Sequence, residues 1–208
     1  MDYAFLRRQM VEEQLLRRGI RDNRVLAAFY KVPRHKFVSL DIIDNAYADF
    51  PLPIGYGQTI SQPYIVALMI ELLNLTGSER VLEVGTGSGY QTALLAELAG
   101  EVYTVERLSS LANKAELLLK ELGYTVKLKT GDGALGWPEA APFDSIIVSA
   151  SAYFVPQPLI EQLRDGGKMI LPLGNSFSQV LTLAEKVGGQ IKYKDICGCA
   201  FVPLISEV

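Results

Sequence analysis

The feature that most constrains this chain is a glycine loop between a strand pattern and a helix pattern. The segment RVLEV (80–84) predicts a short buried strand, GTGSG (85–89) a loop, and YQTALLAELA (90–99) a helix. Glycines at such a turn let the backbone come close to a ligand, beside the free amides at the helix N-terminus. A strand–loop–helix unit of this kind predicts right-handed crossovers and a mostly parallel sheet.

Strand and helix patterns go on alternating after this unit. The tail differs, because QVLTLAEKV and QIKYKDI flank Gly188-Gly189, which is typical of an antiparallel hairpin. The sequence therefore predicts a three-layer α/β fold with a seven-stranded, mostly parallel sheet and a C-terminal hairpin. The other expected elements are strands at 101–106, 125–130, 143–150 and 168–174, and helices at 109–122 and 158–164.

The first 76 residues carry helical patterns and one unusual segment. Residues 3–17 and 22–31 predict amphipathic helices, the second beginning at Asp22 and stopped by Pro33. Between them and an apolar helix over 64–75 lies PLPIGYGQTISQPYIV (51–66). This segment is too apolar for a plain linker and has too many breakers for a strand, so we expect a shaped loop that approaches a ligand.

Composition excludes several classes of protein. The 208 residues are 49% hydrophobic and carry a net charge of -3, whereas a protein that mainly binds the nucleic-acid backbone needs a basic face. We find no signal peptide and no apolar run of membrane-spanning length, so we expect a cytoplasmic protein without a membrane partner. Cys197, Cys199 and the single histidine, His35, do not form a metal-ligand pattern, and no metal is expected.

Three acidic residues follow or end successive strands. Glu83 stands two residues before the first loop glycine, Glu106 ends the next strand, and Asp132 follows the third. A carboxylate beside the loop would repel the pyrophosphate of a dinucleotide but attract the ammonium and sulfonium of S-adenosylmethionine. Glu106 suits two ribose hydroxyls and Asp132 an adenine amino group, so the pattern favours S-adenosylmethionine as the cofactor.

Five segments resemble the protein-L-isoaspartate O-methyltransferase family, in register and in order, over roughly residues 5–205. The GYGQTIS part is specific, because the glycine loop alone is common to most class I methyltransferases. The resemblance implies one Rossmann-like class I methyltransferase domain over 1–208, divided into a helical region (1–50), a covering loop and helix (51–76), a cofactor-binding core (77–175) and the hairpin (176–208). The segments are PLPIGYGQTIS, VLEVGTGSGYQTALLAEL, VYTVER, GDGALGWPEAAPFD and LIEQLRDGGKMILPLG.

The resemblance also implies an activity and a set of residues. Members of the family transfer a methyl group from S-adenosylmethionine to the α-carboxylate of L-isoaspartyl residues in damaged proteins and peptides. The ester then collapses to a succinimide, whose hydrolysis partly restores aspartate. The implied active-site residue is Ser61, and the implied substrate contacts are Ile60, Ser61 and Val202. The implied cofactor contacts are Gln58, Thr59, Ile60, Ser61, Glu83, Gly85, Thr86, Gly87, Ser88, Gly89, Tyr90, Glu106, Arg107, Asp132 and Gly133.

This chemistry does not require a general base. A peptide carboxylate has a pKa of about 3.3 to 4.3 and is already ionised near neutral pH, which agrees with a chain holding one histidine outside the motifs. What remains is to align the carboxylate with the methyl group and to exclude water. Ser61 suits that task as a hydrogen-bond donor. The expected partners are isoaspartyl peptides and age-damaged proteins, with the enzyme a monomer that does not bind nucleic acid.

Three features depart from the family pattern. Val66 stands where some relatives have a histidine, and Tyr153 replaces a proline common in that loop. The chain stops at Val208, soon after FVPLI, so contacts from longer tails are not expected.

Several alternatives stay open at the level of sequence. Ser61 can instead be the N-cap of the helix that starts at Pro63. The arginines at 17, 18, 21 and 24 suggest a nucleic-acid methyltransferase, although acidic residues are interspersed among them. A nicotinamide-dependent oxidoreductase uses a similar glycine loop, but Glu83 disfavours it. A protein that binds the cofactor without catalysis, or a class I methyltransferase with another acceptor, completes the set.

Overall fold

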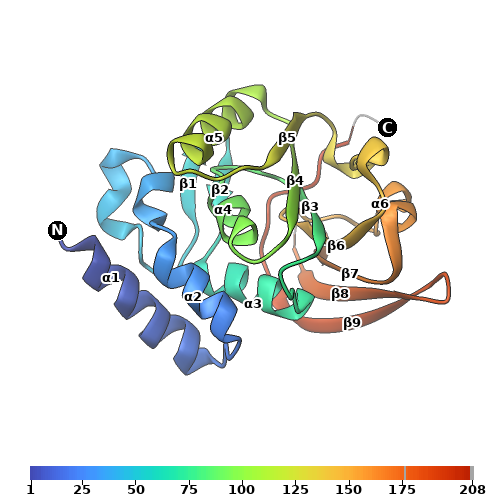
Figure 1. The fold of residues 1–208 in the computed structure, drawn as a ribbon, viewed down its shortest axis with the longest axis horizontal. Helices are drawn as coiled ribbons and strands as arrows, with labels where there is room; N and C mark the ends of the chain where they lie inside the picture. Colours follow the sequence, from blue (N-terminus) through green and yellow to red (C-terminus); the bar gives the residue numbers. More distant parts are fainter. Residues whose placement is uncertain (176, 207–208) are drawn as a thin grey trace.

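A seven-stranded sheet forms the centre of the molecule. The computed structural model describes residues 1–175 and 177–206, and its strands follow the order β5-β4-β3-β6-β7-β8-β9. The first five in that order run parallel, and β8 and β9 are each antiparallel to the strand before (Figure 1). The predicted α/β fold is confirmed. The strands are β3 (Arg80–Val84), β4 (Glu101–Glu106), β5 (Lys127–Thr130), β6 (Phe143–Val148), β7 (Leu163–Gly174), β8 (Gln179–Val187) and β9 (Gln190–Cys199).

Helices cover both faces of this sheet and so create three layers. Successive residues of a strand face opposite sides, and accordingly Val81 joins one apolar core while Leu82 and Val84 join the other. Helices α2, α3 and α4 close the first core, and α6 contributes Leu159 to the second. The helices are α1 (Tyr3–Gln9), α2 (Asn23–Lys31), α3 (Pro63–Leu73), α4 (Tyr90–Ala96), α5 (Ser109–Glu121) and α6 (Gln157–Gln162).

The N-terminal region is helical, as predicted, but its first helix changes pitch. After α1 the chain continues as a π-helical segment (Met10–Leu15) and a 3-10 turn (Leu16–Arg18), then stops at Gly19. The Asp22 carboxylate caps α2 by accepting bonds from the amides of Arg24 and Val25. This confirms the predicted start of the second helix.

The segment that we expected to be a loop forms a small antiparallel hairpin of its own. Strands β1 (Leu52–Gly55) and β2 (Gln58–Ile60) pair with each other across a turn at Tyr56 and Gly57. Both turn residues have positive φ, 54° and 71°, the conformation that suits the twist of a two-residue hairpin turn. The breakers therefore shape a hairpin, with an irregular register between Pro53 and Gly55.

Helix α3 begins one residue later than a Ser61 cap would require. Its N-cap is Gln62, which makes no side-chain capping bond, and Pro63 occupies the first turn. The interpretation of Ser61 as an N-cap is therefore wrong. Its hydroxyl belongs to the segment that joins β2 to α3.

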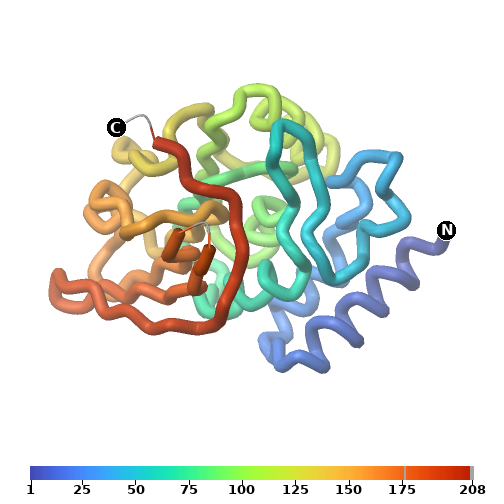
Figure 2. The backbone as a smooth tube through the Cα atoms, turned by 180° about the vertical axis from the view of Figure 1, so that it is seen from behind, coloured from blue at the N-terminus to red at the C-terminus, as the bar shows by residue number. Residues whose placement is uncertain are grey.

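The C-terminal end of the chain crosses the carboxyl ends of the parallel strands. The predicted hairpin is confirmed, with β8 and β9 joined through Gly188 and Gly189. Beyond β9 the chain returns toward the middle of the sheet, where Ser151 donates its amide to the Val202 carbonyl and accepts the Leu204 amide, over 2.8 and 2.7 Å. Figure 2 shows this return as the red tube that runs over the middle of the molecule.

Among residues 1–175 and 177–206, no helix combines the length and apolar character needed to cross a membrane.

Candidate active site

The glycine loop lies at the carboxyl end of β3, the middle strand of the parallel part. The Gly87 amide donates a hydrogen bond to Oε2 of Glu106 over 2.8 Å, so the loop is tied to the end of β4. Gly87 has a φ of 54°, and a Cβ at this position would lie 3.3 Å from Cδ1 of Ile54 in β1. Glycine here lets the loop and the β1–β2 hairpin approach each other. The loop therefore presents backbone to the space between them.

Glu83 lies beneath this loop. Its Oε2 accepts hydrogen bonds from the hydroxyls of Thr92 and Thr104 over 2.5 and 2.7 Å, and its Oε1 accepts one from Nε2 of Gln91 over 3.0 Å. The side chain is fully buried. Burial raises the pKa of this carboxyl to about 7, against the lowering effect of the three donors.

This placement differs from the expectation that the Glu83 charge faces the cofactor. Glu83 is not among the residues that line the hollows described below. Through these hydrogen bonds Glu83 links Thr92 in the first turn of α4 to Thr104 in β4, under the loop.

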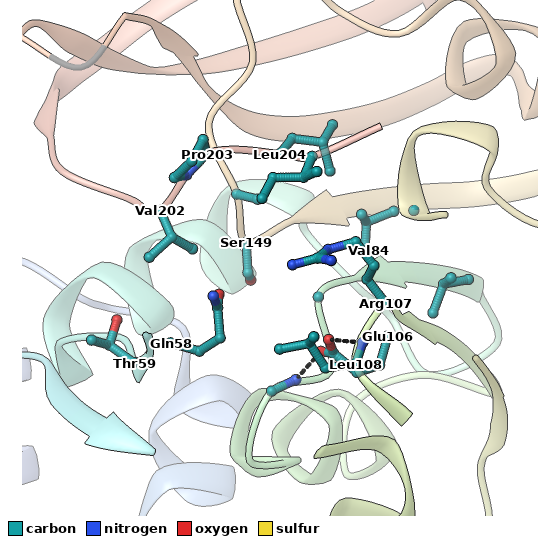
Figure 3. A pocket seen from close by; sticks show the side chains of 16 residues that line it. Gln58, Thr59, Val84, Glu106, Arg107, Leu108, Ser149, Val202, Pro203 and Leu204 are labelled. Carbon is teal, nitrogen blue, oxygen red and sulfur yellow. Dashed lines mark hydrogen bonds between the residues drawn. The ribbon is translucent and has the colours of Figure 1, made fainter. Parts of the chain in front are cut away.

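An outer cleft opens beside the loop, between the ends of β4 and β6. Arg107 and Ser149 point into it from these two strand ends (Figure 3). Its lining is Gln58, Thr59, Val84, Gly85, Gly87, Val105, Glu106, Arg107, Leu108, Gly133, Ser149, Ala150, Val202, Pro203, Leu204 and Ile205.

Glu106 is the carboxylate of the outer cleft. Its Oε2 accepts the Gly87 amide and its Oε1 accepts the Leu108 amide over 3.0 Å. A carboxylate oxygen has two lone pairs, so each oxygen can accept a further hydrogen bond from a ligand hydroxyl. The geometry suits the expected ribose contact.

Asp132 and Gly133 have different places in the structure: Asp132 makes hydrogen bonds within the chain, and Gly133 lines the outer cleft. The Asp132 carboxylate accepts the Ala134 amide over 2.8 Å and the Ser206 hydroxyl over 2.6 Å, and Asp132 is not among the residues of the outer cleft. Gly133 does line it, and a Cβ there would lie 2.4 Å from Cγ1 of Val84. Asp132 thus differs from the expectation of direct adenine contact in this geometry.

The C-terminal tail supplies one wall of the outer cleft. From the tail, the resemblance implies one contact only, that of Val202 with the substrate. In the structure the lining continues through Pro203, Leu204 and Ile205 (Figure 3). An apolar wall opposite a carboxylate suits a ligand with a flat base and a hydroxylated sugar.

Two further spaces adjoin the outer cleft. The inner hollow lies against the glycine loop, and the side cavity lies between α3 and the tail. Thr59 and Ser149 line all three spaces, while Ser61 lines the inner hollow and the side cavity. The inner hollow is lined by Thr59, Ile60, Ser61, Val66, Gly85, Thr86, Gly87, Ser88, Tyr90, Gln91 and Ser149. The side cavity is lined by Pro51, Thr59, Ser61, Gln62, Ile65, Ser149, Gly198, Cys199, Ala200, Phe201 and Val202.

Most of the predicted site residues therefore gather in one place. The exceptions are Glu83, Asp132 and Gly89, of which Gly89 packs beneath the loop, where a Cβ would lie 3.3 Å from Ala115 and Leu119. Val66, which stands where some relatives have a histidine, lines the inner hollow with an apolar side chain, and Tyr153 is 73% exposed. Sequence reasoning missed Ser149, although it follows a parallel strand, where ligands of α/β sheets bind.

The residues around the outer cleft and inner hollow fit S-adenosylmethionine. The backbone of the glycine loop borders both spaces. The Glu106 carboxylate, which can accept further hydrogen bonds, stands at the wall of the outer cleft, and apolar side chains of the tail form another wall. The three-layer fold and this site define a class I S-adenosylmethionine-dependent methyltransferase.

Comparison with known proteins identifies the family. The family described as Protein-L-isoaspartate(D-aspartate) O-methyltransferase (PCMT) matches residues 6–208. The chain belongs to this family.

Relatives match over nearly the whole chain. A protein from Geobacter metallireducens named protein-L-isoaspartate O-methyltransferase is 52% identical over 100% of this chain and 97% of its own length. One of the same name from Dictyoglomus thermophilum is 53% identical over 99% of this chain and 94% of its own. A solved Plasmodium falciparum protein-L-isoaspartate O-methyltransferase, in complex with S-adenosyl-L-homocysteine, covers 99% of both chains with a TM-score of 0.83 and 28% identity.

Proposed function

We propose that this enzyme transfers a methyl group from S-adenosylmethionine to the α-carboxylate of L-isoaspartyl residues in damaged proteins and peptides. One observation carries the proposal: the cleft that fits the cofactor and a separate side cavity meet at the hydroxyl residues Thr59, Ser61 and Ser149. A transferase needs such a junction, because donor and acceptor must meet with water excluded.

The cofactor side is formed by the outer cleft and inner hollow. S-adenosylmethionine, when bound, supplies an electrophilic methyl group on a positively charged sulfur. We assign the Gly85–Gly89 loop and Gln58–Ser61 to the methionine portion, Glu106 to the ribose and Gly133 with the tail to the base. Glu83 and Asp132 support these segments through their hydrogen bonds.

The acceptor side is the side cavity. Ser61 is half-buried at its border with the inner hollow, where its hydroxyl can orient one oxygen of a carboxylate. The nucleophile is already ionised near neutral pH, so no protein base has to remove a proton. Consistent with this, the only histidine lies elsewhere: His35 stacks on Tyr3 at 4.0 Å and its Nδ1 shares a hydrogen bond with the Tyr47 hydroxyl over 2.7 Å.

We expect polypeptide rather than nucleic acid as the acceptor. The four N-terminal arginines that suggested a nucleic-acid enzyme are engaged within the chain. Arg17 pairs with Glu13, Arg18 with Asp49, and Arg24 donates to the carbonyls of Leu75 and Leu98; Arg21 donates to the carbonyls at 16 and 20. These contacts support a structural role for the cluster.

The remaining expectations concern assembly and location. We propose a monomer, because the donor and acceptor spaces are built within one chain. We propose a cytoplasmic enzyme, and the free thiols of Cys197 and Cys199 on β9 are compatible with a reducing compartment.

The test offers methyl-labelled S-adenosylmethionine with two peptides that differ only in isoaspartyl or aspartyl linkage. We expect base-labile label in the isoaspartyl peptide alone. Equal labelling of both peptides, or of neither, would contradict the proposal, and labelling of transfer RNA or DNA instead would favour the alternative acceptor.

A further inference from the structure

Ser149 is a hydroxyl residue at the junction of the three spaces that the proposed function leaves without a role. It follows β6, and its amide is fixed by a hydrogen bond to the Val84 carbonyl over 2.9 Å. A Cβ on Gly85 would lie 3.4 Å from the Ser149 Cβ, so the side chain stands directly beside the glycine loop. Figure 3 shows its hydroxyl and the Gln58 carboxamide pointing toward each other inside the outer cleft.

The direction of the Ser149 hydroxyl bond is set by a neighbour. Nε2 of Gln91 donates to Oε1 of Glu83 over 3.0 Å and to Oγ of Ser149 over 2.8 Å. A carboxamide nitrogen has two hydrogens, and these two bonds use both. In the ionised form of Glu83, the reverse orientation would set the Gln91 oxygen against a carboxylate oxygen that can only accept hydrogen bonds.

Ser149 Oγ is therefore the acceptor in its bond with Gln91. The hydrogen of its own hydroxyl is left to point away from Gln91, toward the spaces that Ser149 lines. The junction thus offers a donor from the residue after β6, in addition to the Ser61 hydroxyl from the segment before α3.

A carboxylate held by one hydrogen bond can still rotate about it, whereas two donors from different elements fix its plane. A fixed plane matters here because in-line methyl transfer depends on the approach of one oxygen. The two hydroxyls can hold the oxygen that does not attack and leave the other oxygen directed at the methyl group.

We propose that Ser149 donates a second hydrogen bond to the isoaspartyl α-carboxylate, and that Gln91 is the positioning residue that orients the Ser149 hydroxyl. This assignment rests on the proposed function, because it requires a carboxylate acceptor at the junction.

The decisive comparison is between Ser149→Thr and Ser149→Val, which share one shape and differ by the hydroxyl. A hydrogen bond to a charged group changes equilibria by about 10- to 100-fold. We expect the Val variant to fall below the Thr variant by that factor in kcat/KM for an isoaspartyl peptide. The same loss should appear in peptide affinity for the enzyme saturated with S-adenosyl-L-homocysteine. The affinities of the Thr and Val variants for S-adenosyl-L-homocysteine itself, measured by calorimetry, should agree within about twofold.

A double-mutant cycle tests the role of Gln91. Gln91→Met should lower kcat/KM when Ser149 is present and add almost nothing to Ser149→Val, because its effect is transmitted through the hydroxyl. Thermal unfolding of each variant separates this coupling from general destabilisation.

Each result decides between assignments. Equal kcat/KM and peptide affinity for the Thr and Val variants would overturn the proposal. So would a parallel loss of S-adenosyl-L-homocysteine affinity, which would place the hydroxyl on the cofactor. If the added methyl prevents folding, Ser149→Ala against the wild type gives the same comparison. A wild-type enzyme that is inactive on the isoaspartyl peptide would instead refute the proposed function.

Discussion

The buried guanidinium of Arg34 donates a hydrogen bond from Nη2 to the carbonyl oxygen of Ser61 over 2.8 Å. Its Nε donates to the Ala46 carbonyl over 2.8 Å, and it stands 4.8 Å from the centre of the Tyr90 ring. Burial lowers the pKa of Arg34 to about 10, so it stays charged near neutral pH. One buried cation thus anchors the residue that borders the side cavity.

Arg34→Met should impair catalysis through Ser61. The change leaves the Ala46 and Ser61 carbonyls without this donor, and the segment before α3 loses its anchor. We expect kcat/KM for an isoaspartyl peptide to fall by at least about tenfold, with S-adenosyl-L-homocysteine affinity within about threefold of wild type. Arg34→Lys keeps the charge but not the fork of donors, and its kcat/KM should be intermediate. A Met variant that folds and keeps full activity would show that the anchor is dispensable.

Ser61→Ala should separate turnover from stability. Because Gln62 is the N-cap of α3 and makes no side-chain capping bond, removing the Ser61 hydroxyl should change the free energy of unfolding by less than about 0.5 kcal/mol. In contrast, kcat/KM should fall by about 10- to 100-fold. Urea titration and steady-state kinetics measure the two effects. A loss of stability with unchanged kinetics would return Ser61 to a structural role.

Glu83→Gln should change how stability depends on pH. Burial raises the pKa of Glu83 in the folded protein to about 7, above its value in the unfolded chain. Its contribution to stability is therefore fully present below the unfolded pKa and is lost as pH rises through about 7. The carboxamide that replaces this carboxyl in the variant does not titrate.

The wild type should therefore lose stability relative to Glu83→Gln between about pH 5 and about pH 8, by on the order of 2 to 3 kcal/mol. Urea unfolding of both proteins at the two pH values measures this difference. A difference between the two proteins that does not change with pH would contradict the buried, titrating carboxyl.

Glu106→Gln should weaken cofactor binding. Glu106 holds the Gly87 amide over 2.8 Å at the wall of the outer cleft, and a neutral amide is a weaker acceptor for the loop and for ribose hydroxyls. We expect the Kd of S-adenosyl-L-homocysteine to rise by roughly tenfold. Glu101→Gln, at the exposed start of the same strand, is the matched control and should leave the Kd unchanged. Equal effects of the two changes would remove Glu106 from the site.

The sheet was predictable because its parallel strands are buried on both faces and so appear as short apolar runs. The position of the glycine loop followed from the strand before it and the helix after it. The role of Glu83 did not follow from the sequence, because an acidic residue before the glycine loop can either face a cationic ligand or hold the loop in place. Only the tertiary positions of Thr92 and Thr104 distinguish the two roles.

Two other features depend on contacts that the local pattern does not encode. The β1–β2 hairpin needs positive φ at Tyr56, a residue type that rarely signals such a turn, and Pro53 argued against a strand. The tail residues Val202 and Leu204 have no periodic pattern that would place them. Their position is set by hydrogen bonds to Ser151, which lies far from them in the sequence.

The most direct test of isoaspartyl methylation follows one isoaspartyl peptide and its aspartyl twin by mass spectrometry during incubation with enzyme and S-adenosylmethionine. We expect only the isoaspartyl peptide to gain the mass of one methylene, at its α-carboxylate, and then to lose methanol, which gives a succinimide and in part the aspartyl peptide. Methylation of the aspartyl twin at a similar rate, or at a site other than the isoaspartyl carboxylate, would contradict this expectation.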